Sequence, residues 1–256
     1  MEITRPASPK QLTVLCEYCG KELEVMKFKL PWKTMTIVPA CECVFEMRKQ
    51  QKQAEKKWEM MEILKRRGFQ SGKYARMTFD NFDNDKLFTD VIASVSDYMN
   101  SVNFAKRNWL YLYGEWGLGK THIGIAATRQ LALARLWQPA FLRWTEYCSL
   151  IQQSWHDKGV KVEWHLGREA QILLLDDIDK KSATPWALGE LYEVLNFRDV
   201  SELPTIITAN RNILELANFW NKNKETEELG KTIISRILGQ VSKIIQFQGA
   251  DYRLYG

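Results

Sequence analysis

Glycine, proline and long apolar runs are scarce in this sequence. The 14 glycines and 7 prolines make up 21 of the 256 residues, far fewer than a collagen-like or low-complexity chain contains. The longest apolar stretches, such as 109–113 and 172–175, are much shorter than the roughly 18 residues that a membrane-spanning helix needs. The first residues contain no apolar segment typical of a signal peptide. These absences exclude a fibrous or disordered protein and predict a soluble, cytosolic one without membrane contact.

The net charge of +5 is unevenly distributed along the chain. Residues 1–78 contain 16 Lys and Arg against 9 Asp and Glu, a surplus of +7, whereas the remaining residues contain 20 against 22, a balance of −2. The segment 46–67 lacks Gly and Pro and is rich in Lys, Gln, Glu and Met, which predicts a helix with a charged face. We therefore expect a small module at 1–50, a basic helical linker at 51–74 and a large domain at 75–256.

Four of the five cysteines lie within 28 residues of the first module. Cys16 and Cys19 are separated by two residues, so one tight turn can aim both sulfurs at a metal, and Gly20 follows where such a turn needs a permissive residue. Cys41 and Cys43 form a closer pair. Thiols in the cytosol stay reduced, which argues against disulfides. The segment is also too small to form its own core, so a bound metal is the favoured interpretation. With no histidine nearby, a tetrahedral Zn²⁺ site would use all four thiolates and would be structural; four unrelated buried thiols are the alternative.

A phosphate-binding loop is the strongest motif in the sequence. The β-rich segment Trp109–Tyr113 predicts a strand, and it leads directly into a match to the P-loop pattern of Gly, four residues and Gly-Lys-Thr. Glycines let successive backbone N–H groups surround phosphates, and the following helix adds its positive end. The residues predicted to bind nucleotide here are Gly114, Glu115, Trp116, Gly117, Leu118, Gly119, Lys120, Thr121 and His122. Lys120 should reach the β- and γ-phosphates of ATP, and the Thr121 hydroxyl should bind Mg²⁺.

A second predicted strand, 171–175, is followed by two carboxylates. Its four consecutive apolar residues are typical of a strand buried on both faces. The acids therefore emerge at the carboxyl end of the sheet, where ligands bind in open α/β folds. We expect Asp176 to lie on the Mg²⁺ side and Asp177 to polarise the attacking water. A loop acid or a helix cap is the alternative for Asp177.

Three further polar residues lie near the ends of predicted elements. Asp179 is predicted to cap the helix that follows it. Asn210 ends a strand predicted at 204–210 and is a candidate to orient the attacking water. Arg236 lies in a predicted helix before a last strand at 243–247, and its spacing alone indicates only a solvated helix residue.

Together these motifs resemble those of AAA+ ATPases, and among them the DnaC/DnaI-type replicative helicase loaders of bacteria and their phages. Residues 78–82 look like the family's entry into its ATPase domain, 117–122 like its Walker A motif and 175–178 like its Walker B motif. The resemblance implies an α/β fold, namely an AAA+ P-loop domain with a three-layer parallel sheet joined to a small N-terminal zinc-binding module. About 180 residues for that domain leave no room for a C-terminal helical lid.

The resemblance also implies roles for residues outside the Walker motifs. Asn210 matches a sensor position, Arg236 matches an arginine that acts on a neighbour's nucleotide, and Arg253 matches a terminal arginine near the phosphates, for which a surface role is the alternative. The cysteines resemble a zinc module that docks onto a DnaB-type helicase. The implied cofactors are ATP or ADP, Mg²⁺ and Zn²⁺. The implied partners are that helicase, single-stranded DNA and further copies of the chain assembled with ATP.

Contact with single-stranded DNA requires basic side chains and aromatic faces on which bases stack. The candidates are Trp144, Trp155, His156, Lys158, Lys161, Trp164 and the basic helix at 48–67, and core packing or a solvated helix face is the alternative. The sequence therefore predicts an ATPase that loads a DnaB-type replicative helicase onto single-stranded DNA during replication initiation. An IstB-type transposition ATPase acting with a transposase on duplex DNA, and an assembly switch without turnover, are the alternatives.

Overall fold

The computed structural model describes residues 13–30, 32–82, 86–159, 162–180, 184–221 and 224–249. The chain divides into two compact units, Met1–Trp58 and Glu59–Gly256. The boundary falls inside α1 (Glu42–Arg66), which begins at Glu42 rather than at residue 46 as the sequence predicts. Within the described residues, no helix is long and apolar enough to cross a membrane.

The first unit contains two short antiparallel strand pairs. They are β1 (Thr13–Leu15) with β2 (Glu22–Glu24), and β3 (Met26–Leu30) with β4 (Lys33–Ile37). The turn between β1 and β2 contains Gly20 at φ +70°, a left-handed conformation that glycine adopts without strain. Among the described side chains of this unit, only Cys16 and Cys41 are buried. Apolar packing therefore contributes little to this unit, and a different source of stability is needed.

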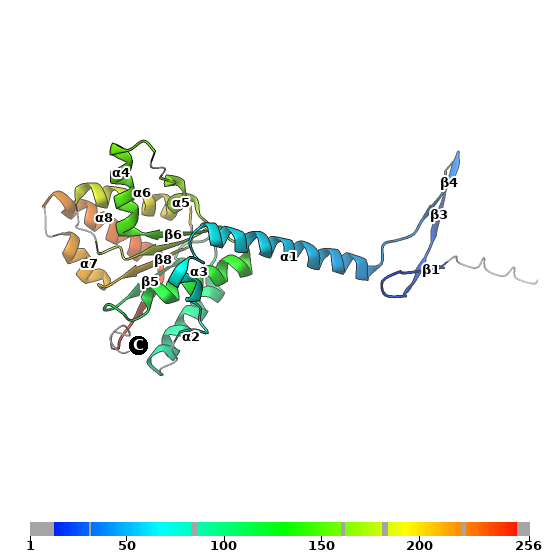
Figure 1. The fold of residues 1–256 in the computed structure, drawn as a ribbon, viewed down its shortest axis with the longest axis horizontal. Helices are drawn as coiled ribbons and strands as arrows, with labels where there is room; N and C mark the ends of the chain where they lie inside the picture. Colours follow the sequence, from blue (N-terminus) through cyan, green and yellow to red (C-terminus); the bar gives the residue numbers. More distant parts are fainter. Residues whose placement is uncertain are drawn as a thin grey trace, which may run out of the picture. The chain divides into compact units, whose positions relative to one another are not determined.

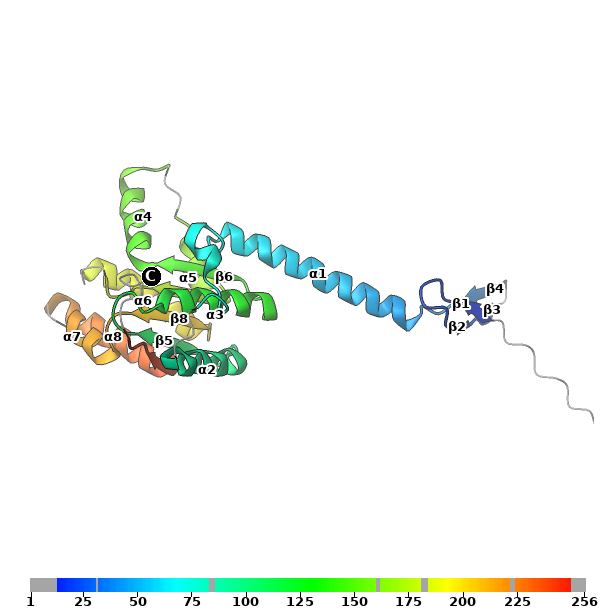
Figure 2. The ribbon, with the colours of Figure 1, turned by 60° about the horizontal axis from the view of Figure 1, so that its bottom comes forward.

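The second unit consists of alternating strands and helices. Its elements in chain order are η1 (Gly72–Arg76), α2 (Lys86–Ser101), β5 (Trp109–Tyr113), α3 (Lys120–Arg135), β6 (Pro139–Arg143), α4 (Trp144–His156), α5 (Trp164–Glu169), β7 (Ile172–Asp176), α6 (Pro185–Val200), β8 (Thr205–Ala209), α7 (Ile213–Trp220), α8 (Lys224–Gln240) and β9 (Val241–Gln246). The five strands form one parallel sheet in the order β6-β7-β8-β5-β9. Figure 2 shows β6, β8 and β5 in that order across the sheet. All four strands predicted from the sequence are found in it.

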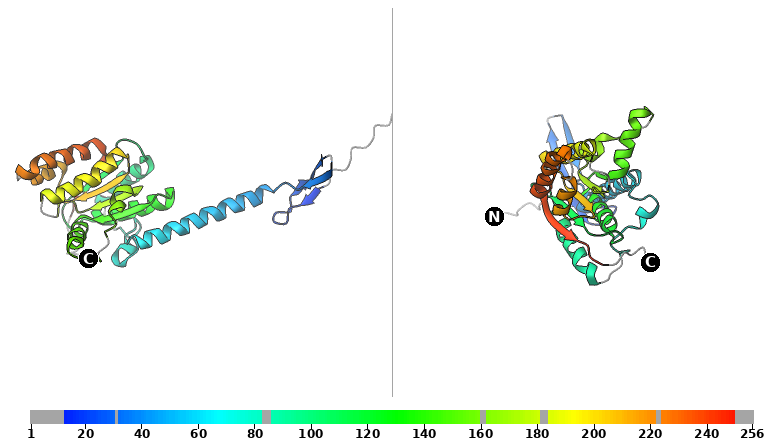
Figure 3. Two further views of the ribbon diagram at one scale, coloured as in Figure 1. Left: turned by 90° about the horizontal axis from the view of Figure 1, so that it is seen from above. Right: turned by 90° about the vertical axis from the view of Figure 1, so that its left-hand side faces the viewer.

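The strands of this sheet are buried on both faces because successive side chains of a strand point in opposite directions. In β5, Trp109 and Tyr111 belong to a core shared with α6 and α8, whereas Leu110 and Leu112 belong to a core shared with α2 and α3. Figures 1 and 3 show these helices on the two sides of the sheet. The sheet is therefore the middle of three layers, as the sequence predicts.

The residues after β6 and β9 define two further features of this unit. Trp144, one of the candidates for DNA contact, begins α4 and is 2% exposed, while Cys148 on the same helix is fully buried. Both residues belong to the core, so for Trp144 the alternative of core packing is correct. After β9, the structure describes residues 247–249, and these contain no helix.

Candidate functional site

The carboxyl ends of β5, β8 and β7 lie next to one another in the sheet. A predicted site residue lies at or just after the end of each of these strands. β5 leads into the P-loop, β8 ends one residue before Asn210, and β7 ends in Asp176. Parallel pairing therefore brings residues that are distant in sequence into contact. Lys120 Nζ, for example, lies 3.2 Å from Asn210 Oδ1.

Two glycines of the P-loop are required by close approaches of the chain. A Cβ atom at Gly114 would lie 2.4 Å from the carbonyl oxygen of Phe247, and one at Gly119 would lie 2.4 Å from the ring of Phe82. Gly119 also has a φ of +84°, which side chains other than glycine rarely adopt. The shape of the loop therefore depends on glycine at both positions.

Lys120 begins α3 and folds back over the loop. Its ammonium group donates to the carbonyl oxygens of Gly114 at 2.7 Å and Glu115 at 2.5 Å, in addition to Asn210. Burial lowers the pKa of Lys120, and the negative charge of Asp177 acts in the opposite direction. An anion that entered the loop would supply the negative charge that this buried ammonium lacks.

Thr121 and Asp176 form the hydroxyl and carboxylate pair expected of a Mg²⁺ site. Thr121 Oγ1 donates to Asp176 Oδ1 at 2.8 Å, and Thr208 Oγ1 donates to the same oxygen at 2.7 Å. Asp176 is 1% exposed, and burial raises its pKa, an effect that the neighbouring charge of Asp177 strengthens. Hydroxyl and carboxylate oxygens are the hard ligands that Mg²⁺ prefers. The pair therefore fits the metal that accompanies nucleotide phosphates, and such a cation would favour the ionised carboxylate.

Asp177 lies in the turn after β7 and faces the cavity beside the P-loop. Its backbone has a φ of +58°, and its N–H donates to Thr208 Oγ1 at 2.9 Å. Its Oδ2 atom forms an ion pair with Lys180 Nζ at 2.5 Å. The carboxylate is thus held by a cation that no sequence motif indicated.

Asp179 does not cap α6, so that prediction is wrong. The cap is Thr184, whose Oγ1 accepts from the N–H of Ala187 at 3.2 Å. The Asp179 carboxylate instead accepts from the N–H groups of Asn210 and Arg211 at 2.9 and 3.1 Å, and it forms an ion pair with the Arg211 guanidinium at 3.1 Å. Asp179 therefore fastens the end of β7 to the end of β8, because only the folded sheet brings these donors to it.

A cavity of about 300 Å³ lies over the P-loop. Predicted residues that line it are Trp116, Gly117, Leu118, Gly119, Lys120, Thr121, His122, Asp177 and Asn210, and residues not predicted to bind nucleotide are Met77, Asn81, Phe82 and Lys180. His122 Nε2 donates to the carbonyl oxygen of Thr78 at 2.7 Å, and its ring packs edge-on against Phe82 with centroids 5.1 Å apart. The sequence motif at 78–82 therefore packs against the start of α3, a position that depends on the fold and not on the motif.

Arg236 is not brought to this cavity. Its guanidinium group lies 3.2 Å from Asp199 Oδ2 and 3.0 Å from the hydroxyl oxygen of Tyr192, both on α6. It lines a separate recess with Lys106 and Lys231. Because α8 leads into the start of β9, this recess lies near the amino-terminal ends of the parallel strands, whereas the P-loop lies at their carboxyl ends. Arg253 lies outside the described residues.

The residues suggested for DNA contact are only partly brought together. Trp155 is 57% exposed, and its ring lies against Trp186 with centroids 5.0 Å apart. His156 and Lys158 are exposed, whereas Lys161 and the side chain of Trp164 lie outside the described residues. One exposed tryptophan, which packs against the half-buried Trp186 of α6, therefore lies near exposed basic side chains at the end of α4.

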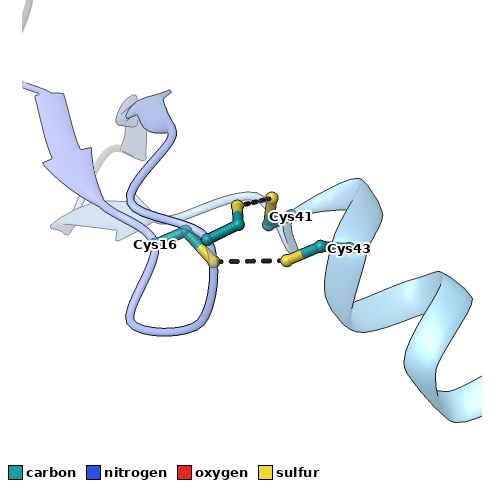
Figure 4. Close-up of side chains that lie close together, drawn as sticks. Cys16, Cys41 and Cys43 are labelled. Carbon is teal, nitrogen blue, oxygen red and sulfur yellow. Dashed lines mark hydrogen bonds between the residues drawn. The ribbon is translucent and has the colours of Figure 1, made fainter.

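The four cysteines of the first unit converge on one point, and Figure 4 shows Cys16, Cys41 and Cys43 facing one another there. The Sγ atoms of Cys16 and Cys43 lie 3.5 Å apart, as do those of Cys19 and Cys41, and all four lie within 4.8 Å of one another. Four thiolates around Zn²⁺ at about 2.3 Å would be separated by about 3.8 Å, so the cluster fits a tetrahedral zinc. Hydrogen bonds from the N–H groups of Cys19 and Tyr18 lower the pKa of Cys16 to about 6, whereas burial and the neighbouring cysteine side chains raise the pKa of Cys43. A metal would therefore displace a proton from Cys43 when it binds.

The sheet order and the P-loop with its adjacent acids define an AAA+-type nucleotide-binding domain. The model of the bacterial DnaA ATPase domain matches residues 74–233. The chain therefore belongs to the bacterial DnaA ATPase domain family.

Individual relatives support the predicted resemblance to AAA+ helicase loaders. The replicative helicase loader DnaI of Bacillus subtilis is 29% identical over 167 residues, which are 63% of this chain and 53% of DnaI. The chain thus spans about half the length of the curated relatives it matches. The match to a crystal structure of DnaI covers 68% of this chain and 89% of the DnaI chain in that structure, with 22% identity and a TM-score of 0.56. The match to a crystal structure of the DnaC helicase loader covers 70% of this chain and 100% of the DnaC chain in that structure, with 18% identity and a TM-score of 0.56.

Proposed function

We propose that this chain is an ATP-hydrolysing loader of a DnaB-type replicative helicase onto single-stranded DNA. The observation that supports this most directly is the combination, in one chain, of a P-loop cavity lined by Lys120, Asp177 and Asn210 with a separate cluster of four cysteines. The cavity has the groups that nucleotide hydrolysis needs, and the cluster provides a metal-stabilised unit for a partner. A transposition ATPase or a simple assembly switch gives no reason for the cysteine cluster.

In this proposal, each residue at the cavity acts on a different part of ATP. Lys120 pairs with the β- and γ-phosphates, while Thr121 and Asp176 hold the Mg²⁺, which neutralises phosphate charge. Asp177 accepts a proton from, or orients, the attacking water, and Asn210 positions the same water. The contacts among these five side chains support the assignment, because each lies within hydrogen-bond reach of another or lines the same space.

Arg236 would act on the nucleotide of a neighbouring copy. The recess around Arg236, near the amino-terminal ends of the strands, is open and also contains the cations Lys106 and Lys231. These positive charges would attract the phosphates of a nucleotide bound to a neighbouring copy. Hydrolysis then requires an oligomer assembled in the presence of ATP, because no copy can complete its own site. This geometry supports an ATP-dependent homo-oligomer as the active form.

The first unit would bind the helicase. Zinc held by Cys16, Cys19, Cys41 and Cys43 would fix the turn between β1 and β2 and the start of α1. Apolar side chains near the cysteines are largely exposed, namely Leu15 at 62%, Tyr18 at 68% and Phe45 at 69%. Such side chains are typical of a surface that a partner protein covers. Single-stranded DNA would be contacted elsewhere, and the exposed Trp155 with Lys158 is a suitable stacking and charge pair.

A loading assay tests the proposal directly. Circular single-stranded DNA coated with single-strand-binding protein is incubated with a bacterial DnaB-type helicase and ATP, with and without the full chain, and the helicase retained on the DNA is measured. We expect retention to depend on the chain and on ATP, one zinc per chain by mass spectrometry, and loss of both zinc and retention in Cys41→Ser. The matched thiol variant Cys148→Ala should keep its zinc. A zinc-containing, ATP-hydrolysing chain that never increases retention would rule out the loader function and leave the ATPase.

A further inference from the structure

We propose that Lys180 exchanges partners between Asp177 and the γ-phosphate of ATP. In the absence of a γ-phosphate it neutralises the carboxylate that polarises water, and when ATP binds it moves to the phosphate and releases that carboxylate. This inference rests on the proposed ATPase function and deepens it, because it adds a positioning residue that belongs to none of the sequence motifs. Such an exchange would let the site distinguish ATP from ADP.

Lys180 contacts one of these partners and lines the cavity proposed to hold the other. Its Nζ atom lies 2.5 Å from Asp177 Oδ2, and the side chain lines the P-loop cavity together with Lys120 and Asn210. It also lines the adjoining recess that contains Glu115 and Arg211. Because Lys120 is the residue expected at the β- and γ-phosphates, a second ammonium on the same cavity is available to the terminal phosphate.

The backbone around this pair is fixed, so only the lysine side chain has to move. The N–H of Asp177 is held by Thr208 Oγ1 at 2.9 Å, and the N–H of Ile178 donates to the Thr208 carbonyl oxygen at 3.2 Å. Asp179, whose side chain is fully buried, fastens the same turn to the residues after β8. In the ion pair itself the lysine side chain is 42% exposed and the aspartate 12%. The exposed, flexible member is therefore the one that can change partner.

The charge of the cavity favours this exchange when a triphosphate enters. The positive charge of Lys180 contributes to the lowered pKa of Lys120, so the two ammonium groups are close enough to repel each other. A terminal phosphate carries more negative charge than one carboxylate and presents three oxygen acceptors, so it competes well for an ammonium donor. ADP lacks this group, and with ADP the ammonium would stay on Asp177.

The first test measures how well the full chain distinguishes a triphosphate from a diphosphate. Dissociation constants of Mg²⁺ with AMPPNP and with ADP are determined for the wild type, Lys180→Met, Lys180→Arg and the surface control Lys243→Met, whose ion pair with Asp97 lies on β9 away from the cavity. We expect Lys180→Met to weaken AMPPNP binding by about tenfold or more, the effect of losing a charged hydrogen bond, with ADP affinity nearly unchanged. Lys180→Arg should retain the preference, and Lys243→Met should behave as the wild type.

The second test asks whether Asp177 competes for the lysine. Asp177→Asn removes the competing carboxylate, so it should tighten AMPPNP binding several-fold in the wild-type background. In the Lys180→Met background the same change should have no such effect, because the lysine that would be released is absent. A general electrostatic effect of removing a negative charge would persist in both backgrounds, and that result would overturn the exchange.

The outcomes separate this inference from the function on which it rests. If the wild type binds no ATP and never hydrolyses it, both fail. If the wild type binds and hydrolyses ATP but Lys180→Met keeps the same ratio of AMPPNP to ADP affinity, only the inference fails. Unchanged ADP binding in Lys180→Met shows that the variant is folded, so the comparison of the two nucleotides stays decisive.

Discussion

Replacing Arg236 by alanine tests the assignment that this residue acts between copies of the chain. If Arg236 completes a neighbour's site, Arg236→Ala should reduce the rate of ATP hydrolysis in the assembled protein by about 10³-fold or more, the size of effect that an arginine finger has on phosphoryl transfer. ATP binding to the single chain should be unaffected, because the guanidinium lies near the amino-terminal ends of the parallel strands, whereas the P-loop lies at their carboxyl ends.

The polar contacts of Arg236 indicate how much stability the same change removes. The ion pair with Asp199 is 24% exposed on each side, so it contributes at most about 1 kcal/mol. The hydrogen bond to Tyr192 adds about 1 kcal/mol. Asp199 would keep its bond from Gln240 Nε2 at 2.5 Å. A loss of about 1 to 2 kcal/mol in the free energy of unfolding therefore accompanies a much larger loss of hydrolysis.

The assay combines three measurements on the full chain: ATP hydrolysis as a function of protein concentration, the dissociation constant for ATP, and urea unfolding. Arg168→Ala is the matched control, since Arg168 also forms a partly exposed ion pair with a residue of α6, Glu193 at 3.8 Å. We expect the control to hydrolyse ATP normally. The reasoning would be refuted if Arg236→Ala hydrolysed ATP as the wild type does, or if its loss of hydrolysis matched a loss of folded protein.

Three further predictions concern the P-loop cavity. Lys120→Ala should weaken ATP binding by at least about 100-fold in a fluorescence titration, because it removes the buried ammonium that pairs with the phosphates; unchanged binding would refute the P-loop assignment. Gly119→Ala should lower the free energy of unfolding by about 1–3 kcal/mol and weaken ATP binding, because Gly119 has a positive φ and a Cβ atom there would meet the Phe82 ring. Gly189→Ala, which meets nothing within 4 Å in α6, should instead stabilise the protein by up to about 1 kcal/mol. Burial lowers the pKa of His122, so the unfolded chain binds more protons below about pH 6.5 and stability should fall as the pH drops. His122→Gln should reduce this dependence, and an unaltered pH profile of unfolding would count against it.

Much of the nucleotide site could be predicted because its parts are local in sequence. A strand followed by a glycine-rich loop, and a buried strand followed by acids, each specify their own geometry, and the parallel sheet then brings Lys120, Asp176 and Asn210 to one edge. The role of Asp179 could not be predicted in this way. Its partners are N–H groups after β8 that become neighbours only when β7 and β8 pair, so in the sequence it resembles any acid before a helix.

The role of Lys180 could not be predicted from the sequence for a related reason. A lysine next to a second lysine before a predicted helix indicates only a solvated surface. Its ion pair with Asp177 depends on the turn that Asp179 fastens and on the positive φ of Asp177. Asp179 therefore has a consequence for the site, because it holds the chain so that the next side chain, Lys180, faces the cavity.

The second cysteine pair shows how the start of a helix can bring together two thiols that are separated by one residue. Cys41 precedes α1 and its carbonyl oxygen accepts from the N–H of Val44 at 3.0 Å, whereas Cys43 is the second residue of the helix. The chain changes direction between them, so both sulfurs face the turn that contains Cys16 and Cys19. Since Cys16 and Cys41 are the only buried side chains among the described residues of this unit, the folding of the unit would be linked to binding of the proposed metal. A surface for the helicase on this unit would therefore exist only while the metal is bound, and the ATPase domain, whose cores lie within the second unit, would remain folded without it.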